Sequence, residues 1–197
     1  MSNQKNEQGN TVIKTVEEPK EDTVIFFKKY QIKSGTITYE TVLNTISVHL
    51  KFKKVVYFDN YGMKERRDTY TGDTLDESLM SDGKNMYNIM HKTKEAFKTG
   101  QAYHGTESKF GWDEISQEDK ALGKAKKYPD EIIAGKKCQV YHVEIYPVLA
   151  IYAGWKNICL FTEIKSKGGS SISRAVKVEV GPVDSSKFLI PGGYTIK

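Results

Sequence analysis

Hydrophobic and polar residues alternate in short runs along most of the chain, which is the pattern of half-buried β-strands. Residues 32–42 place Ile37 and Tyr39 on one face of such a strand. Residues 47–58 alternate similarly but change phase at Lys53 and Lys54, which predicts a β-bulge or a strand break. Further strands are predicted after a turn at residues 59–62, on both sides of a turn within residues 78–90, and over residues 93–97, 101–104, 137–145, 155–164 and 171–180.

Two turn signals connect the early strands. Within VVYFDNYGMKERRDTY, residues 55–70, the sequence Asp-Asn-Tyr-Gly predicts a hairpin loop in which Gly62 adopts a left-handed conformation. Asp82 and Gly83 form a strong two-residue hairpin signal. Successive turns of this kind predict neighbouring antiparallel strands connected as a meander.

A helical pattern covers residues 112–127, WDEISQEDKALGKAKK. Acidic residues near its start, lysines near its end, and Ile115 and Leu122 on one face agree with an amphipathic helix that Pro129 ends. Several strands, one helix and several more strands favour a mainly β (α+β) fold rather than a parallel sheet. We therefore expect a strongly curved antiparallel sheet with the helix covering its concave side.

The composition of the 197-residue chain divides it into a short polar segment and a longer remainder. Residues 1–23 are polar and predict a flexible N-terminal tether, and residues 24–197 are long enough for a single domain. No run approaches the roughly 20 apolar residues of a membrane-spanning helix. The start of the sequence lacks the features of a secretory signal, which leaves a cytoplasmic protein or an exported protein whose signal was removed.

The charge distribution permits several partners. The tether holds three lysines and five acidic residues, so the formal charge of +5 leaves +7 on the rest of the chain. Phospholipid headgroups, nucleic acid and acidic proteins all suit a basic body. Nucleic acid is the weakest of these, because the consecutive Arg66 and Arg67 point to opposite sides of a strand and have Glu65 and Asp68 beside them. We therefore expect no nucleic-acid partner.

Motifs for catalysis or metal binding are absent from the sequence. The four histidines have no metal-ligand spacing, and no Gly-x-Ser-x-Gly nucleophile motif occurs. Cys138 and His142 would lie about 13 Å apart on a strand, too far for a catalytic pair. We expect no enzyme activity, no metal and no cofactor. Cys138 is either a small buried apolar residue or half of a cross-strand disulfide with Cys159.

The apolar residues predict a large concave surface. If they all point to the concave side, one modest helix must cover them, and the interior is either a filled core or a partly filled pocket that holds acyl chains. The candidate lining residues are Tyr39, Leu50, Phe52, Tyr57, Met80, Met86, Ile89, Tyr141, Val143, Ile158, Leu160 and Ile190.

Five motifs together resemble the lipoprotein-carrier superfamily of LolA- and LolB-like half-barrels, a group of exported proteins common in Bacteroidetes. They are YFDNYG with Glu65 and Arg66, SDGKNMY from Ser81, AGKKC from Ala134, WKNI from Trp155 and FLIPGGY from Phe188. The resemblance covers about residues 32–196. It implies an incomplete antiparallel β-barrel of roughly eleven strands, with helices over a hydrophobic cavity, that binds lipid or the acyl chains of lipoproteins.

The resemblance also implies a location. We expect a periplasmic or outer-membrane-anchored protein, tethered through an N-terminal lipid that was attached ahead of the present sequence, that binds a hydrophobic ligand without altering it chemically. In an oxidising periplasm, Cys138 and Cys159 on adjacent strands would form a disulfide. Neither the gating arginine of the carrier nor the protruding loop of the acceptor is found in this sequence. Two alternatives stay open: an envelope protein-protein interaction module with a filled core, and an enzyme on a carrier-like scaffold.

Overall fold

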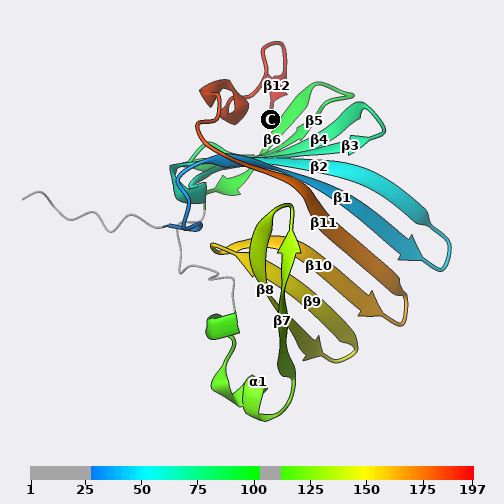
Figure 1. The fold of residues 1–197 in the computed structure, drawn as a ribbon. Helices are drawn as coiled ribbons and strands as arrows, with labels where there is room; N and C mark the ends of the chain where they lie inside the picture. The colour runs from blue at the N-terminus through cyan, green and yellow to red at the C-terminus, as the bar shows by residue number, and fades with distance from the viewer. Residues whose placement is uncertain (1–27, 103–111) are drawn as a thin grey trace, which may run out of the picture.

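The computed structural model describes residues 28–102 and 112–197, which form a mainly β fold (Figure 1). The predicted tether of residues 1–23 lies outside the described residues. The strands are β1 Gly35–Thr45, β2 His49–Asp59, β3 Lys64–Thr71, β4 Thr74–Ser81, β5 Asn85–Met90, β6 Glu95–Gln101, β7 Ala125–Ile133, β8 Lys136–Ile145, β9 Val148–Trp155, β10 Ile158–Ser166, β11 Gly169–Val180 and β12 Thr195–Ile196. Short helices are η1 Asn60–Gly62, η2 Trp112–Glu114, α1 Gln117–Ala121 and η3 Ser185–Phe188.

All twelve of these strands belong to one sheet, in the order β12-β6-β5-β4-β3-β2-β1-β11-β10-β9-β8-β7. Every neighbouring pair is antiparallel except β12 with β6, which is parallel. The first and last strands of this order do not pair with each other, so the sheet curves strongly without closing (Figure 1). The predicted curved antiparallel sheet is confirmed.

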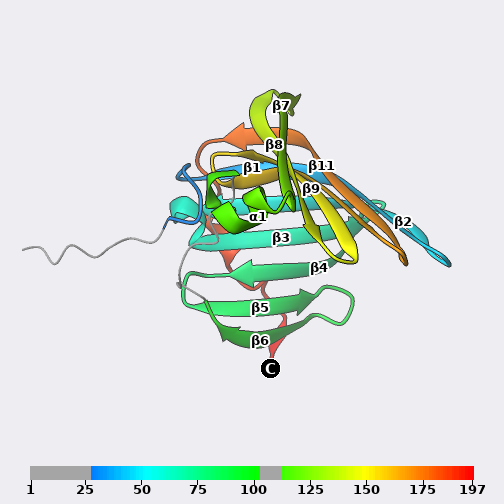
Figure 2. The same cartoon turned by 90° about the horizontal axis from the view of Figure 1, so that it is seen from below.

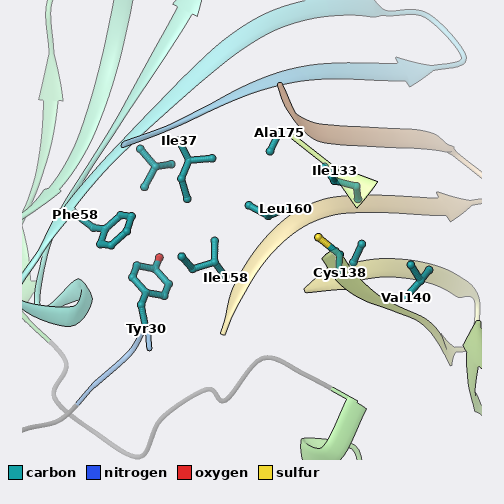
Figure 3. Close-up of a cluster of buried hydrophobic side chains, with 11 residues drawn as sticks. Tyr30, Ile37, Phe58, Ile133, Cys138, Val140, Ile158, Leu160 and Ala175 are labelled. Atoms are coloured by element: carbon teal, nitrogen blue, oxygen red, sulfur yellow. The ribbon is translucent and has the colours of Figure 1, made fainter. Parts of the chain in front are cut away.

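The main hydrophobic core brings together residues of β1, β2 and β7–β11. Ile37 of β1 lies opposite Val56 of β2, and Phe58 lies two residues further along the same face. Figure 3 shows Ile37 and Phe58 pointing toward Ile158 and Leu160 of β10. Residues of β10 come from the far half of the sheet, so the sheet curls toward the face that carries Ile37, Val56 and Phe58. We call this face the concave face. The main core comprises Tyr30, Ile37, Val56, Phe58, Ile133, Cys138, Val140, Ala153, Ile158, Leu160 and Ala175.

We call the opposite face the outer face. Over β3–β6 it is covered by the C-terminal segment of the chain. In Figures 1 and 2 the red C-terminal segment, residues 181–197, lies on the side of the sheet away from β7 and β8. Buried Met80, Ile89 and Ala96 pack there against Ile190 and Tyr194. The fold therefore has two separate apolar clusters.

The predicted helix is much shorter than expected. Instead of spanning residues 112–127, the chain forms η2 and the five-residue α1, and strand β7 begins at Ala125. Gly123, with φ of +69°, ends the helical region. Pro129 lies within β7, where an edge strand with a register shift tolerates the missing N–H. No residue of α1 is buried, so the described residues do not show a helix covering the concave side.

The predicted break at Lys53 and Lys54 is also wrong. The pairing of β2 with β1 and with β3 continues through both residues without a register shift. The hydrophobic pattern changes phase because both faces of the sheet are covered beyond this point. Val56 and Phe58 are buried on the concave face, and Tyr57 is partly buried on the outer face. Apolar residues are therefore required at consecutive positions rather than at alternate ones.

The two cysteines are free, which corrects the expected disulfide. Cys138 lies on β8 and Cys159 on β10, and β9 runs between these strands. Two strand spacings, roughly 9.6 Å, exceed the Cα separation of about 4.4–6.8 Å that a disulfide requires. Cys138 instead acts as a small buried apolar residue of the main core.

The hairpin turn at Gly62 is confirmed and gives a stability prediction. Gly62 has a φ of +86°, and a Cβ there would lie 2.7 Å from Cδ2 of Tyr30. Gly62→Ala should therefore lower the free energy of unfolding by about 2–4 kcal/mol, through backbone strain and a clash in the core. Gly72 has a φ of +58° with nothing within 4 Å, so Gly72→Ala should cost only about 1 kcal/mol. Urea denaturation measures both, and equal losses would contradict the clash.

Candidate functional site on the concave face

Three of the predicted lining residues lie in or against the filled main core. Ile158 and Leu160 are 2% and 0% exposed. Tyr39 packs against the same cluster, and its hydroxyl donates a 2.9 Å hydrogen bond to the carbonyl oxygen of Cys159. Burial raises the pKa of Tyr39, so the phenol stays protonated and acts as the donor. These residues support the curl of the sheet.

Four other predicted residues, Tyr57, Met80, Ile89 and Ile190, lie on the outer face, which corrects their assignment to the concave side. Tyr57 is opposite Arg66 of β3, and Arg66 is opposite Met80 of β4, so all three share one face. Ile89 packs with Met80 in the outer cluster, together with Ile190. The cause is the continuous register of β2, which places Tyr57 and Phe52 on opposite faces.

Four predicted residues do come together on the concave face. Residues directly opposite in antiparallel pairs are neighbours on one face. One row across the sheet is Phe52, Thr41, Ser173, Thr162, Tyr152 and Tyr141, and the next is Leu50, Leu43, Ser171, Ile164, Ala150 and Val143. Trp112 of η2 lies against Tyr141, with ring centroids 6.3 Å apart. Leu50 and Ile164 remain 49% and 37% exposed.

The concave face also exposes apolar residues over β4, β5 and β6, and we call them the β4–β6 patch. Leu79, Met86, Met90 and Phe97 form this patch and are between 36% and 46% exposed. Leu79 lies opposite Asn88, and Asn88 opposite Phe97, so the three cross the strands in one row. Figure 2 views the sheet from this side, with β7 and α1 in front of β1–β3 and clear of β4–β6.

Met86 was among the predicted lining residues, whereas Leu79 and Phe97 were not. Their strands contain many polar residues, so no alternating apolar run marks either of them in the sequence. A further polar group lies within the β4–β6 patch. The side-chain oxygen of Asn88 is buried and has no hydrogen-bond partner. An unpaired buried acceptor costs about 1–3 kcal/mol, which a bound molecule with a donor group could recover.

A charged cluster borders the patch on the concave face. Glu65, opposite Phe58, accepts hydrogen bonds from Lys29 Nζ at 2.5 Å, the Tyr30 hydroxyl at 2.6 Å and Arg67 Nε at 2.5 Å. Burial alone would raise the pKa of Glu65, but the charges of Arg67 and Lys29 outweigh it and lower the pKa. Glu65 is therefore ionised, and both of its oxygens are occupied.

The Glu65 cluster predicts a specific pH dependence of stability. Because the folded-state pKa of Glu65 is lowered, its contribution is complete above the unfolded-state pKa of about 4.3 and is lost as the pH falls through the folded-state value. Glu65→Gln should cost about 2 kcal/mol of unfolding free energy at neutral pH and progressively less in acid. Urea denaturation across this pH range tests it, and a pH-independent difference between the two proteins would contradict the assignment.

Lys54 is the other cation of this region. It lies on the concave face, opposite Tyr39 of β1 and Thr69 of β3, and it is partly buried. Its Nζ lies 5.0 Å from the centroid of the Phe52 ring. Burial, and then the charge of Arg67, lower the pKa of Lys54. Among the described residues, no carboxylate forms an ion pair with it.

A buried polar network lies on the outer face. Asp68 Oδ1 accepts hydrogen bonds from Arg66 Nε at 2.6 Å and from the Ser78 hydroxyl at 2.5 Å. His91 connects Ser78, at 2.7 Å from Nε2, to the Tyr194 hydroxyl, at 2.8 Å from Nδ1. The carboxylate contacts the serine rather than the histidine, so this is not the arrangement of a Ser-His-Asp hydrolase. The network joins the C-terminal segment to the sheet.

Reactive thiols, metal-binding groups and membrane-spanning helices are lacking in the described part of the chain. Burial raises the pKa of the Cys138 thiol and raises that of Cys159 to about 11, which makes both poor nucleophiles. Residues 28–102 and 112–197 contain no group of three or more His, Cys, Asp or Glu side chains placed to hold a metal ion. No helix within these ranges has the length and apolar character needed to span a membrane.

Comparison with known proteins identifies similar folds. No family model matches the chain, and no curated protein sequence matches it. An uncharacterized conserved protein from Thermus thermophilus matches with a TM-score of 0.55 at 7% identity, over 84% of this chain and 90% of that one. MucB, solved in complex with MucA(peri), matches with a TM-score of 0.49 at 9% identity, over 86% of this chain and 58% of MucB.

A LolA superfamily protein from Nitrosomonas europaea also matches, with a TM-score of 0.40 at 8% identity, over 84% of this chain and 96% of that one. The likeness to the Thermus protein establishes a shared fold. The incomplete antiparallel barrel that the sequence predicted is confirmed as a curved sheet that does not close. Identities this low show the fold alone.

Proposed function

We propose that the protein binds a hydrophobic ligand, a lipid or the acyl chain of a lipoprotein, on its concave face without catalysing a reaction. The observation that carries this proposal is the β4–β6 patch, where four large apolar side chains of one sheet face remain between 36% and 46% exposed. Contiguous exposed apolar surface of this kind is typical of binding sites. On the outer face of the same strands, the C-terminal segment covers the apolar side chains, whereas those on the concave face stay exposed.

The physical basis of binding is apolar burial. Each methylene of an acyl chain that leaves water contributes about 0.8 kcal/mol, and the patch side chains lose water at the same time. Two methionines in the patch suit a surface that adapts to flexible chains, because their side chains are unbranched and polarizable. The strip from Leu50 to Val143 extends the apolar surface on the same face.

The place of action that suits this function is the bacterial envelope. The resemblance of the sequence motifs to LolA- and LolB-like proteins supports a periplasmic or membrane-anchored protein that handles lipid or acylated lipoproteins. An N-terminal lipid anchor on the tether would hold the concave face near a membrane surface, and the basic body would favour anionic headgroups.

Ligand capture tests the proposal. The purified chain should carry lipid that native mass spectrometry detects, and after delipidation it should bind a fluorescent fatty acid that unlabelled fatty acid displaces. Absence of both co-purified lipid and displaceable probe binding would overturn the proposal.

A protein-protein interaction module is the second candidate, favoured by the filled main core around Ile158 and Leu160. On this alternative the β4–β6 patch would dock another envelope protein rather than a lipid. A chain that binds no fatty acid, yet loses a specific protein partner when Leu79 and Phe97 are replaced by serine, would establish this alternative instead.

A further inference from the structure

We propose that the ligand of the concave face is an anionic amphiphile, with its headgroup against the ammonium group of Lys54 and its acyl chain along the β4–β6 patch. This inference rests on the proposed function, because it names the class of molecule that occupies the same face. It adds a polar requirement that apolar burial alone does not impose.

The register places the ammonium group and the patch on one continuous surface. From Lys54 on β2, the directly opposite residues run through Thr69 and Glu77 to Met90 of the patch. Three strand spacings separate β2 from β5, roughly 14 Å. A single long acyl chain can therefore reach from Lys54 across the patch without leaving the concave face.

The charges on this part of the face do not balance. Lys29, Lys54 and Arg67 are cations, while Glu65 is the carboxylate that lies among them. Both oxygens of Glu65 already accept hydrogen bonds from Lys29, Tyr30 and Arg67. Lys54 is not among these donors, so Glu65 does not serve as its counter-charge.

Glu77 and Glu95 are further carboxylates on the row of Lys54. Glu77 lies two strands away, roughly 9.6 Å across the sheet, and it forms no ion pair with Lys54. Glu95 forms an ion pair with Lys197, and this pair adds no net charge. Counting all of these groups still leaves the region with one more cation than carboxylates. An anionic headgroup beside Lys54 would complete the charge balance.

The surroundings of Lys54 strengthen the attraction to an anion. The side chain is partly buried, and its ammonium lies above the Phe52 ring at 5.0 Å. Burial and the positive charge of Arg67 both disfavour the protonated form, which is why the pKa of Lys54 is lowered. A bound anion removes this cost, and its attraction to the ammonium is larger here than in open water.

Lys53 provides a matched control on the same strand. As the preceding residue of β2 it points to the outer face, opposite Tyr70 and Glu40, and it is exposed. Its Nζ lies 4.5 Å from the centroid of the Tyr70 ring, so it also lies near an aromatic ring. Lys53→Gln and Lys54→Gln therefore remove the same charge from opposite faces of one strand.

The experiment compares oleic acid with oleyl alcohol, which share a chain and differ in headgroup charge. Competitive displacement of a fluorescent fatty acid from the full chain gives both affinities, at a pH where the acid is ionised and Lys54 is protonated. The wild type should bind the acid about tenfold more tightly than the alcohol, equivalent to about 1.4 kcal/mol. Lys54→Gln should lose this preference with alcohol binding unchanged, and Lys53→Gln should retain it.

Two results would overturn the inference: equal affinities of the wild type for acid and alcohol, or equal weakening of acid binding by the two lysine variants. Failure of the proposed function has a different signature, since neither oleic acid nor oleyl alcohol would then bind to the wild type. Thermal unfolding of both lysine variants should match the wild type, which separates a loss of preference from a loss of fold.

Discussion

Replacing Asp68 with alanine should lower the free energy of unfolding by about 3–5 kcal/mol. Asp68 is 2% exposed and accepts hydrogen bonds from both Arg66 and Ser78. The Arg66 side chain is only 8% exposed, so the variant leaves a buried guanidinium group without its counter-charge. Ser78, which is fully buried, loses one acceptor in the same change.

An exposed ion pair supplies the control for Asp68→Ala. Lys177 and Glu179 lie 2.9 Å apart with side chains 64% and 56% exposed. Glu179→Gln should change the free energy of unfolding by no more than about 0.5 kcal/mol, because water and salt screen such a pair. Urea denaturation at neutral pH compares the two variants. Similar small effects for both would contradict a structural role for the outer-face network.

Replacing Leu79 and Phe97 together with serine should weaken fatty-acid binding at least tenfold. The two side chains lie on either side of Asn88 in one row of the β4–β6 patch and are 46% and 36% exposed. Together they offer a ligand roughly 100 Å² of apolar surface, which corresponds to about 2.5 kcal/mol of lost burial. Because both are partly exposed, the double variant should fold with near wild-type stability.

Leu189 provides the control for the patch variant. It is 62% exposed and belongs to the C-terminal segment that covers the outer face. Leu189→Ser removes a comparable apolar side chain from the other side of the sheet, so fatty-acid affinity should stay at the wild-type value. Equal losses of affinity in the two variants would indicate non-specific binding to exposed apolar surface.

Local signals in the sequence were sufficient to predict the turns and most of the strands. Gly62 adopts the left-handed conformation that its hairpin predicted. Asp82 and Gly83 close the β4–β5 hairpin, where Asp82 Oδ1 accepts hydrogen bonds from the backbone N–H groups of Lys84 and Asn85, both at 2.7 Å. These features depend on residues close together in the chain, so composition and spacing were enough to identify them.

The assignment of residues to faces could not be predicted, because it depends on distant segments. Tyr57 and Met80 appeared suitable for the concave side, yet the C-terminal segment lies more than a hundred residues later and covers their face instead. Likewise, residues 112–127 have a helical composition, but Lys126 and Lys127 pair with β8 as part of a strand. Tertiary pairing overrode local propensity at both places.

The site itself was only partly visible in the sequence. Met86, Leu50 and Phe52 were predicted and do lie on the concave face, whereas Leu79 and Phe97 join them only through strand register. Lys54 resembled one of several solvated lysines. Its partial burial becomes apparent only when its neighbours across the sheet are known.

Photo-crosslinking with a diazirine-bearing fatty acid, followed by peptide mass spectrometry, tests whether the ligand binds on the concave face. We expect the labels to concentrate on concave-face residues of β4, β5 and β6, above all Leu79, Met86 and Phe97, and excess unlabelled fatty acid should prevent the labelling. Labels distributed over both faces, or the absence of competable labelling, would contradict a binding site on the concave face.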